Sequence, residues 1–373
     1  MRYCFDLDGT ICTQEQNYHD ARPIASMVDH VRRLHAEGHS IVIFTARGTE
    51  TGMDWRSITE AQLAAWGVPY DRLMFGKPAA DFYVDDRAVP VRTLERKPAY
   101  ICAEVGINHS GSLEAALKLI DAAVAAGANA VKFQKRSPSL CVPRDQWDIQ
   151  RATPWGVMSY IDYKHRLELS PGDYYVIDAY CREKAIEWSA SAWDVPSLDF
   201  LMAYNLPWLK VASASLTDDN LLHELAETGK PIILSTGMST IEELRHATDI
   251  LGDSLHTICH CNSTYPCPPE DLNLLCIETL RREFPGVAIG YSGHEVGLAT
   301  TLAAVAMGAS FIERHITLDR ASWGTDQSAS VEPHGFERLV RDIRSIESAM
   351  GDGVKRITEG ELGPRARLRG VPA

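Results

Sequence analysis

The feature that most constrains the fold is a regular alternation of short apolar runs and amphipathic segments along most of the chain. From residue 99 onward, eight apolar runs of strand length recur, and helical patterns separate them. Eight strand and helix units in about 250 residues predict a closed (β/α)8 barrel, in which reactive groups gather at the carboxyl ends of the strands. The expected strands are residues 100–104, 130–134, 187–191, 208–213, 231–235, 257–261, 287–292 and 310–315.

Residues 1–97 carry a shorter run of the same alternation. The elements expected there are strands at 3–6, 40–44, 72–75 and 82–85 and helices at 24–36 and 59–66. Short connections between such elements predict an α/β domain with a parallel sheet. A charged joint that ends in proline, residues 93–98, marks the boundary, so residues 1–97 form one predicted domain and residues 98–350 the barrel.

Composition and charge narrow the partners of the chain. Its 373 residues are 45% hydrophobic and 23% charged, which is typical of globular domains. The formal net charge of −13 disfavours nucleic acids and anionic membranes, because both reward clustered Lys and Arg. An odd count of nine Cys and the lack of an apolar signal segment favour a reducing cytoplasm. Since no apolar run reaches the roughly 20 residues of a membrane span, we expect a soluble protein with small-molecule pockets.

Two aspartates, two positions apart, stand at the end of the first expected strand, in the segment Phe5-Asp6-Leu7-Asp8-Gly9-Thr10. This places them at the carboxyl end of a parallel sheet, where ligands bind. Such a pair suits phosphoryl transfer: Asp6 would attack phosphorus, while Asp8 would protonate the leaving oxygen and later activate water. Because the anionic nucleophile and the phosphate repel each other, we expect Mg²⁺ bound by the carboxylates of Asp6, Asp8, Asp85 and Asp86.

Thr45, next to the end of the second expected strand, offers a hydroxyl to a phosphoryl oxygen, and Lys77 offers a compensating positive charge. In this order, the motifs of residues 1–92 resemble those of the haloacid dehalogenase (HAD) superfamily of phosphatases. The resemblance implies a Rossmann-like fold and a Mg²⁺-dependent phosphatase. The insertions in which that family places cap domains are too short here to fold separately, so we expect a capless, open site. The alternatives are a turn at Asp8-Gly9 with solvated acids, or a docking or lid module without catalysis.

Polar residues stand at the carboxyl ends of the expected barrel strands. Two lysines, Lys132 and Lys210, and several hydroxyls predict a local anion site inside an acidic protein. His294 and His315, near the ends of neighbouring strands, suggest a divalent metal. Residues 135–169 lack a clean period and predict a long loop over this end of the barrel. The full set of strand-end residues is Glu104, Lys132, Gln134, Ser189, Lys210, Ser213, Ser235, His260, Ser292, His294, Glu313 and His315.

Seven ordered segments across residues 99–350 resemble the sialic acid synthase family, metal-dependent TIM-barrel enzymes that join phosphoenolpyruvate to an N-acylated hexosamine. These segments are residues 103–109, 131–134, 209–213, 234–237, 260–266, 290–294 and 313–319. The resemblance implies that His294 and His315 bind Mn²⁺ or a similar ion, and that Glu104 and Asp326 contact the sugar. It also implies a catalytic role for Glu104, Lys132 and Lys210. The residues implied to bind phosphoenolpyruvate are Lys132, Gln134, Lys210, Ser213, Ser235 and Tyr265.

Two features depart from the pattern of that family. Gln327 follows Asp326 where the family often has His, which bears on the choice of sugar. The chain ends at Ala373, about where an antifreeze-like domain usually begins, so we expect that domain to be absent. Residues 351–373 would then form a basic tail that is either solvated or supplies an arginine in place of the missing domain.

Together, the two resemblances predict a bifunctional enzyme. The barrel would make a nine-carbon 2-keto acid 9-phosphate from phosphoenolpyruvate and an N-acylhexosamine 6-phosphate, and the N-terminal domain would remove the 9-phosphate. In the alternative, the synthase uses an unphosphorylated or unusual aldehyde, and the phosphatase acts on another phosphate ester. The family resemblance also implies a homodimer.

Overall fold

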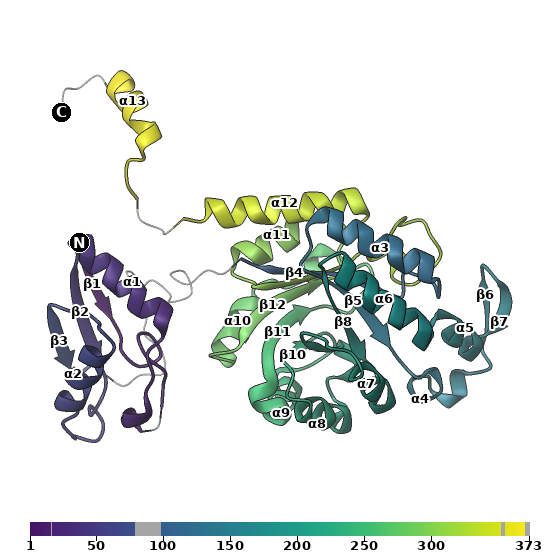
Figure 1. The fold of residues 1–373 in the computed structure, drawn as a ribbon, viewed down its shortest axis with the longest axis horizontal. Coiled ribbons are helices and arrows are strands. Elements are labelled where there is room, and N and C mark those ends of the chain that lie inside the picture. The colour runs from purple at the N-terminus through teal and green to yellow at the C-terminus, as the bar shows by residue number, and fades with distance from the viewer. Residues whose placement is uncertain (16, 79–97, 352–354, 370–373) are drawn as a thin grey trace. The chain divides into compact units, whose positions relative to one another are not determined.

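The computed structural model describes residues 1–15, 17–78, 98–351 and 355–369. The chain divides into two compact units, Met1–Lys97 and Pro98–Ala373 (Figure 1). The strand expected at 82–85 lies outside the described residues, and so do Asp85 and Asp86.

The first unit contains a parallel sheet of three described strands, ordered β1-β2-β3. The strands are β1 (Arg2–Phe5), β2 (Ser40–Thr45) and β3 (Arg72–Phe75), and the connections contain η1 (Tyr18–Asp20), α1 (Ala25–Ala36) and α2 (Arg56–Ala65). Helix α1 buries Met27, Val31 and Leu34 at helical spacing against the sheet core, which includes Ile41 and Ile43. Because the strands are parallel, the residues that follow them lie at one edge of the sheet.

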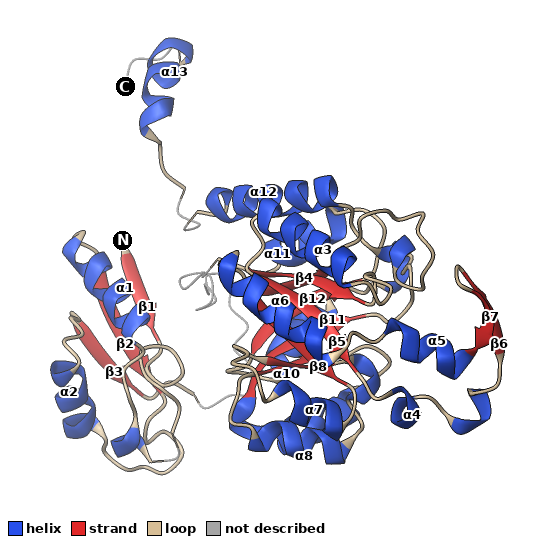
Figure 2. Cartoon of the chain, turned by 45° about the vertical axis from the view of Figure 1, so that its right-hand side comes forward, coloured by secondary structure: helices blue, strands red, loops and turns tan. Residues whose placement is uncertain are grey.

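The second unit is built on a closed barrel of eight parallel strands, as the alternation predicted. Their order around the barrel is β10-β11-β12-β13-β4-β5-β8-β9, and helices surround them (Figure 2). The strands are β4 (Tyr100–Gly106), β5 (Ala130–Lys135), β8 (Glu187–Ala192), β9 (Leu209–Val211), β10 (Ile232–Ser235), β11 (Leu255–Cys261), β12 (Ala288–Gly293) and β13 (Phe311–His315).

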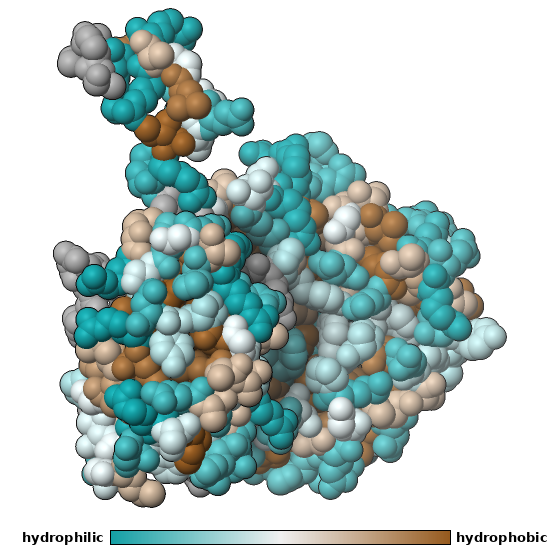
Figure 3. Space-filling model, turned by 60° about the vertical axis from the view of Figure 1, so that its left-hand side comes forward, coloured by the Kyte–Doolittle hydropathy of each residue, from teal (hydrophilic) through white to brown (hydrophobic). Residues whose placement is uncertain are grey.

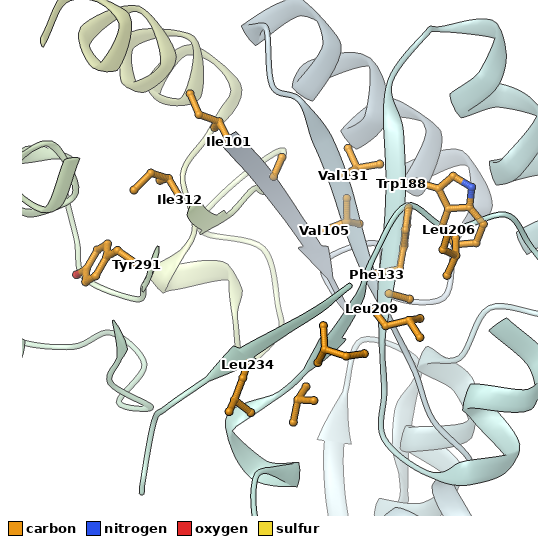
Figure 4. Close-up of a cluster of buried hydrophobic side chains, with 14 of the residues drawn as sticks. Ile101, Val105, Val131, Phe133, Trp188, Leu206, Leu209, Leu234, Tyr291 and Ile312 are labelled. Atoms are coloured by element: carbon orange, nitrogen blue, oxygen red, sulfur yellow. The ribbon is translucent and has the colours of Figure 1, made fainter. Parts of the chain in front are cut away.

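Each barrel strand is buried on both faces: one face packs against the helices, and the other points into the barrel. On β5, Val131 and Phe133 belong to the apolar layer between the strands and the helices (Figure 4). Lys132 and Gln134 alternate with them, so they point into the barrel, where Lys132 is buried. The two-residue period of a strand thus places polar side chains inside while apolar ones hold the helices.

The helices between the strands begin and end at recognisable signals. Ser170 and Thr240 each form a capping box with the acid three residues later, which satisfies free N–H groups at the starts of α6 and α9. Gly127 ends α3 with φ of +79°, a conformation that glycine adopts without strain. The barrel helices are α3 (Leu113–Ala126), α6 (Pro171–Glu183), α7 (Val195–Leu201), α8 (Asp219–Glu227), α9 (Ile241–Leu251), α10 (Cys276–Glu283), α11 (Ala299–Ala306) and α12 (Pro333–Ala349).

An insertion, residues 136–168, separates β5 from α6. The prediction of one long loop was wrong, because the insertion contains α4 (Pro138–Cys141), a hairpin of β6 (Gln150–Thr153) and β7 (Gly156–Ser159), and α5 (Tyr160–Leu167). The hairpin projects from the barrel (Figure 2). At its base, Tyr163 and Leu167 pack on Ile107, and Trp323 meets the rings of Trp155 and Tyr163. Aromatic packing between segments that are distant in the sequence orders the insertion. Hydrophobic periodicity does not reveal such packing.

The C-terminal segment differs from the expected tail in containing a helix, α13 (Glu359–Leu368). All its described residues from Lys355 to Arg369 are exposed, including Leu362 and Leu368. Elsewhere on the face drawn in Figure 3, apolar residues are interspersed among hydrophilic ones. Among the described residues, no helix has the length and apolar character that a membrane span requires.

The amino-terminal end of the barrel interior is closed by aromatic side chains. Phe311 is 4% exposed and its ring lies 5.4 Å from that of Tyr100 and 5.5 Å from that of Trp208. We expect Phe311→Ala to lower the free energy of unfolding by about 3–5 kcal/mol, because it leaves a cavity that rigid strands cannot fill. Urea unfolding followed by circular dichroism measures this loss. Phe311→Leu should lose less, and a loss of only about 0.5 kcal/mol for Phe311→Ala, typical of surface sites, would contradict the packing.

Candidate active sites

Two lysines and two glutamates lie inside the barrel near the carboxyl ends of its strands. Lys132 and Lys210 are 3% and 2% exposed, and Glu104 and Glu313 are 1% and 5% exposed. The Nζ atom of Lys132 is 2.7 Å from Oε2 of Glu104, and Nζ of Lys210 is 3.0 Å from Oε1 of Glu313. Because Lys132 also lies 3.8 Å from Glu313, the four groups form one continuous charge cluster.

The charge cluster gives its two carboxyl groups different pKa values. Burial raises the pKa of Glu104 to about 7; Lys132 opposes this shift and Glu313 adds to it. Burial would also raise the pKa of Glu313, but Lys132 and Lys210 outweigh burial and lower this pKa to about 2. Glu313 therefore stays ionised as the partner of the lysines, whereas Glu104 can exchange a proton near neutral pH.

Two serine hydroxyls lie against Gly237, which follows β10, and a third serine, Ser235, ends that strand. The Gly237 N–H donates to Oγ of Ser213 at 3.0 Å, and a Cβ atom at this glycine would lie 2.2 Å from Oγ of Ser263. Ser235 is 3% exposed, and its hydroxyl is buried with no hydrogen-bond partner among the described residues. A buried hydroxyl without a hydrogen-bond partner destabilises the fold unless a ligand forms the missing hydrogen bond. This serine cluster, Ser213, Ser235 and Ser263, thus has the donors of an anion site.

Two histidines and a tyrosine meet beside the serine cluster. The ring centroids of His294 and His315 are 5.4 Å apart, and the Tyr265 ring lies 4.0 Å from His294. Nδ1 of His294 is 2.7 Å from the carbonyl oxygen of Asn262. Since a carbonyl only accepts, Nδ1 carries the hydrogen and leaves the lone pair of Nε2 free for a metal.

His315 also has the features of a ligand for a divalent metal ion. Its Nδ1 atom is buried, has no hydrogen-bond partner among the described residues, and lies 3.9 Å from Oδ2 of Asp326. Burial lowers the pKa of His315, which favours the neutral, metal-binding form of the ring. Within the described part of the chain, no three His, Cys, Asp or Glu side chains converge as a metal site. If His294 and His315 hold an ion, two protein donors leave its other coordination positions open.

Comparison with known proteins assigns the barrel to a family. The NeuB family model matches residues 119–355, more than half of the chain. The chain belongs to the NeuB family. It is 36% identical over 277 residues to N-acetylneuraminate-9-phosphate synthase of Mus musculus, covering 73% of this chain and 77% of that protein. It is 35% identical over 279 residues to N,N'-diacetyllegionaminic acid synthase of Legionella pneumophila, covering 72% of this chain and 78% of that protein.

A solved NeuB-family relative supports the same fold. The N-acetylneuraminic acid (sialic acid) synthetase of Leptospira borgpetersenii, solved in complex with citrate, superposes with a TM-score of 0.65 at 31% identity. The superposition covers 74% of this chain and 94% of that one. The resemblance to sialic acid synthases read from the sequence is thereby confirmed for the barrel.

In this NeuB-family chain, the residues predicted for the barrel separate into two groups. Those brought together around the charge cluster, serine cluster and histidine pair are Glu104, Lys132, Gln134, Lys210, Ser213, Ser235, Tyr265, Ser292, His294, Glu313, His315 and Asp326. Two strand-end residues make structural contacts instead: Ser189 donates to the carbonyl of Trp208, and Nε2 of His260 bonds the carbonyl of Leu272. Sequence reasoning missed Ser191, which bonds Lys132 at 3.1 Å. Ser191 lies two residues after Ser189 in the same expected strand, and this spacing was the signal that could have identified it.

The N-terminal unit lies outside the matched residues and has its own cluster of charges. Asp6 and Asp8 follow β1, Thr45 ends β2, and Lys77 follows β3, so all four stand at one edge of the sheet. Lys77 forms an ion pair with Asp6, and the Lys77 N–H bonds the carbonyl of Thr45 at 3.2 Å. The sequence motifs therefore do converge, apart from Asp85 and Asp86, which lie outside the described residues.

Arg47 is the residue of this edge that sequence reasoning missed. It is 2% exposed, and its guanidinium grips Asp8 with Nη2–Oδ1 and Nε–Oδ2 distances of 2.7 and 2.9 Å. Gln62 and Thr59 of α2 hold the same guanidinium at 2.7 and 3.2 Å. Its position two residues after Thr45 was the signal, since it follows the same strand end.

The buried pair of Lys210 and Glu313 gives a prediction on stability. Lys210→Met should lower the free energy of unfolding by about 3 kcal/mol, because it leaves the buried carboxylate of Glu313 with less compensation. Denaturant unfolding measures this loss. The double variant Lys210→Met/Glu313→Gln should recover part of it, whereas losses that add would contradict direct coupling of the two residues.

Proposed function

We propose that the barrel condenses phosphoenolpyruvate with an N-acylated hexosamine, or with its 6-phosphate, to a nine-carbon 2-keto acid. The observation that carries the proposal is the meeting of Lys132, Lys210, the serine cluster and the histidine pair at one end of the barrel. Relatives with these names, N-acetylneuraminate-9-phosphate and N,N'-diacetyllegionaminic acid synthases, support it.

Phosphoenolpyruvate suits this end of the barrel by its charge. Its phosphate and carboxylate can join Glu104 and Glu313 as partners of Lys132 and Lys210, since each ammonium group can donate more than one charge-assisted hydrogen bond. Ser213, the unpartnered Ser235, Gln134 and Tyr265 would complete the site. Burial opposes the charge on Lys210, but proximity to Glu313 outweighs burial and raises the pKa of this lysine, so we expect Lys210 to stay protonated as the anion enters.

The condensation then forms one carbon–carbon bond and one carbon–oxygen bond, the latter to water, and it breaks the carbon–oxygen bond to phosphate. The enol carbon attacks the sugar aldehyde, and water adds to the cation that develops at the neighbouring carbon. The tetrahedral product expels phosphate by C–O cleavage, and Lys132 and Lys210 offset the phosphate charge. In this proposal Glu104, whose pKa burial raises, would take or give the proton in these steps, and Asp326 would hold the sugar. Mn²⁺ or a similar ion, held by His294 and His315, would polarise the aldehyde.

The metal assignment can be tested by binding as well as by activity. We expect His294→Ala and His315→Ala each to weaken Mn²⁺ binding by about a hundredfold or more, since a metal ligand is lost. Electron paramagnetic resonance of free Mn²⁺ during a titration measures the affinity. His334→Ala is the matched control, because the side chain of His334 is 97% exposed. Unchanged Mn²⁺ affinity in both site variants would rule out this pair as the ligands.

We further propose that the N-terminal unit is a HAD-type phosphatase that acts on the 9-phosphate made by the barrel. Asp6 would attack phosphorus and Asp8 would transfer protons, with Thr45 and Lys77 at the phosphoryl oxygens. Mg²⁺ would be bound at Asp6, Asp8, Asp85 and Asp86. The convergence of Asp6, Asp8, Thr45 and Lys77 at one edge of the sheet supports this role. Phosphatase activity beside a synthase also makes chemical sense if the product still carries a phosphate.

A phosphate count tests the coupling of the two activities. With phosphoenolpyruvate, N-acetylmannosamine 6-phosphate, Mn²⁺ and Mg²⁺, the chain should release two phosphates per keto acid. Asp6→Asn should release one and accumulate the 9-phosphate, because only the nucleophile is lost. Malachite green assays and mass spectrometry of the product measure both values. One phosphate per keto acid from the unaltered chain would favour the alternative, a different phosphate ester or a non-catalytic lid.

A further inference from the structure

Arg136 and Glu168 stand at the two ends of the insertion and contact each other. Nε of Arg136 lies 3.0 Å from Oε1 of Glu168, and the Arg136 backbone N–H donates to Oε2 at 3.3 Å. The guanidinium carbon lies 4.5 Å from the ring centroid of Trp193, and Arg136 is 6% exposed. A buried ion pair therefore closes the base of the insertion.

Arg136 also reaches a residue of the proposed site. Its Nη2 donates to the side-chain oxygen of Gln134, while Nε2 of Gln134 donates to Oε1 of Glu104 at 3.0 Å. A guanidinium can only donate, and a carboxylate can only accept when ionised. One orientation of the Gln134 amide satisfies both neighbours, and the flipped amide satisfies neither.

The contacts of Arg136 assign it an indirect role. One edge of the guanidinium faces Glu168, another faces Gln134, and Trp193 lies against its plane. A guanidinium held in this way acts on the substrate indirectly, through the residue that it positions. Lys135 next to it also pairs with Glu168, at 3.3 Å, but has no hydrogen bond or ion pair with Gln134 or Glu104 in the described structure.

We propose that Arg136 and Glu168 are positioning residues for the condensation: they fix the Gln134 amide so that it donates to Glu104, and so tie the insertion to the site. The inference rests on the proposed function, in which Gln134 binds phosphoenolpyruvate and Glu104 acts in the reaction. It adds that the insertion supports catalysis through its base. Because positioning partners act through a shared group, their losses do not multiply.

A double-mutant cycle tests the proposal. Arg136→Met and Gln134→Leu should each lower kcat/KM for phosphoenolpyruvate about tenfold, as expected when a charge-assisted hydrogen bond is lost. The double variant should also lose about tenfold rather than about a hundredfold. Arg136→Lys, which keeps a donor for Gln134, should recover most of the loss, and Lys135→Met should match the unaltered chain.

Several outcomes would overturn the proposal. Losses that multiply in the double variant would mean that Arg136 acts independently of Gln134. An equal loss in Lys135→Met would mean that any weakening of the Glu168 contacts suffices. If Arg136→Met does not fold by circular dichroism, the cycle is run with Arg136→Lys, whose smaller loss should vanish in the Gln134→Leu background. Calorimetry with phosphoenolpyruvate distinguishes failure of the proposed function from failure of the positioning role. No binding to the unaltered chain would refute the proposed function. Binding to the unaltered chain, together with kcat/KM losses that multiply in the double variant, would refute the positioning role alone.

Discussion

The compensation of buried charge at the carboxyl end of the barrel is the constraint on which the rest of the site depends. Lys132 and Lys210 are almost completely buried, and an uncompensated buried charge costs several kcal/mol. Glu104 and Glu313 supply the compensation in the ligand-free protein. In the proposed function, an anionic substrate would share the two lysines with these glutamates, which is how a net acidic protein could bind a phosphate group.

The same cluster distinguishes two carboxyl groups that look alike in the sequence. Glu313 lies within 4 Å of both lysines and keeps a pKa of about 2, while Glu104 has a pKa of about 7. Separation of this kind lets one carboxylate hold charge and the other move a proton. In the N-terminal unit, each of the two aspartates also has its own basic partner: Asp6 pairs with Lys77 and Asp8 with Arg47.

Most of the barrel and much of its site were predictable from the sequence. Parallel strands with intervening helices bring all carboxyl ends to one face, so the residues at strand ends could be named before their geometry was known. The two-residue period told which of them point inward, as with Lys132 and Gln134. The insertion was not predictable, because its order comes from contacts such as Trp155 with Trp323, which are distant in sequence.

The sequence by itself determined the barrel, its family and the residue types at the strand ends, because these follow from local periodicity and ordered motifs. The tertiary structure alone decided which groups pair. Arg47 grips Asp8 across 39 positions, Lys210 meets Glu313 across 103, and Arg136 turns the Gln134 amide toward Glu104. Such pairing depends on side-chain reach and burial in the folded chain, and no periodic pattern encodes either.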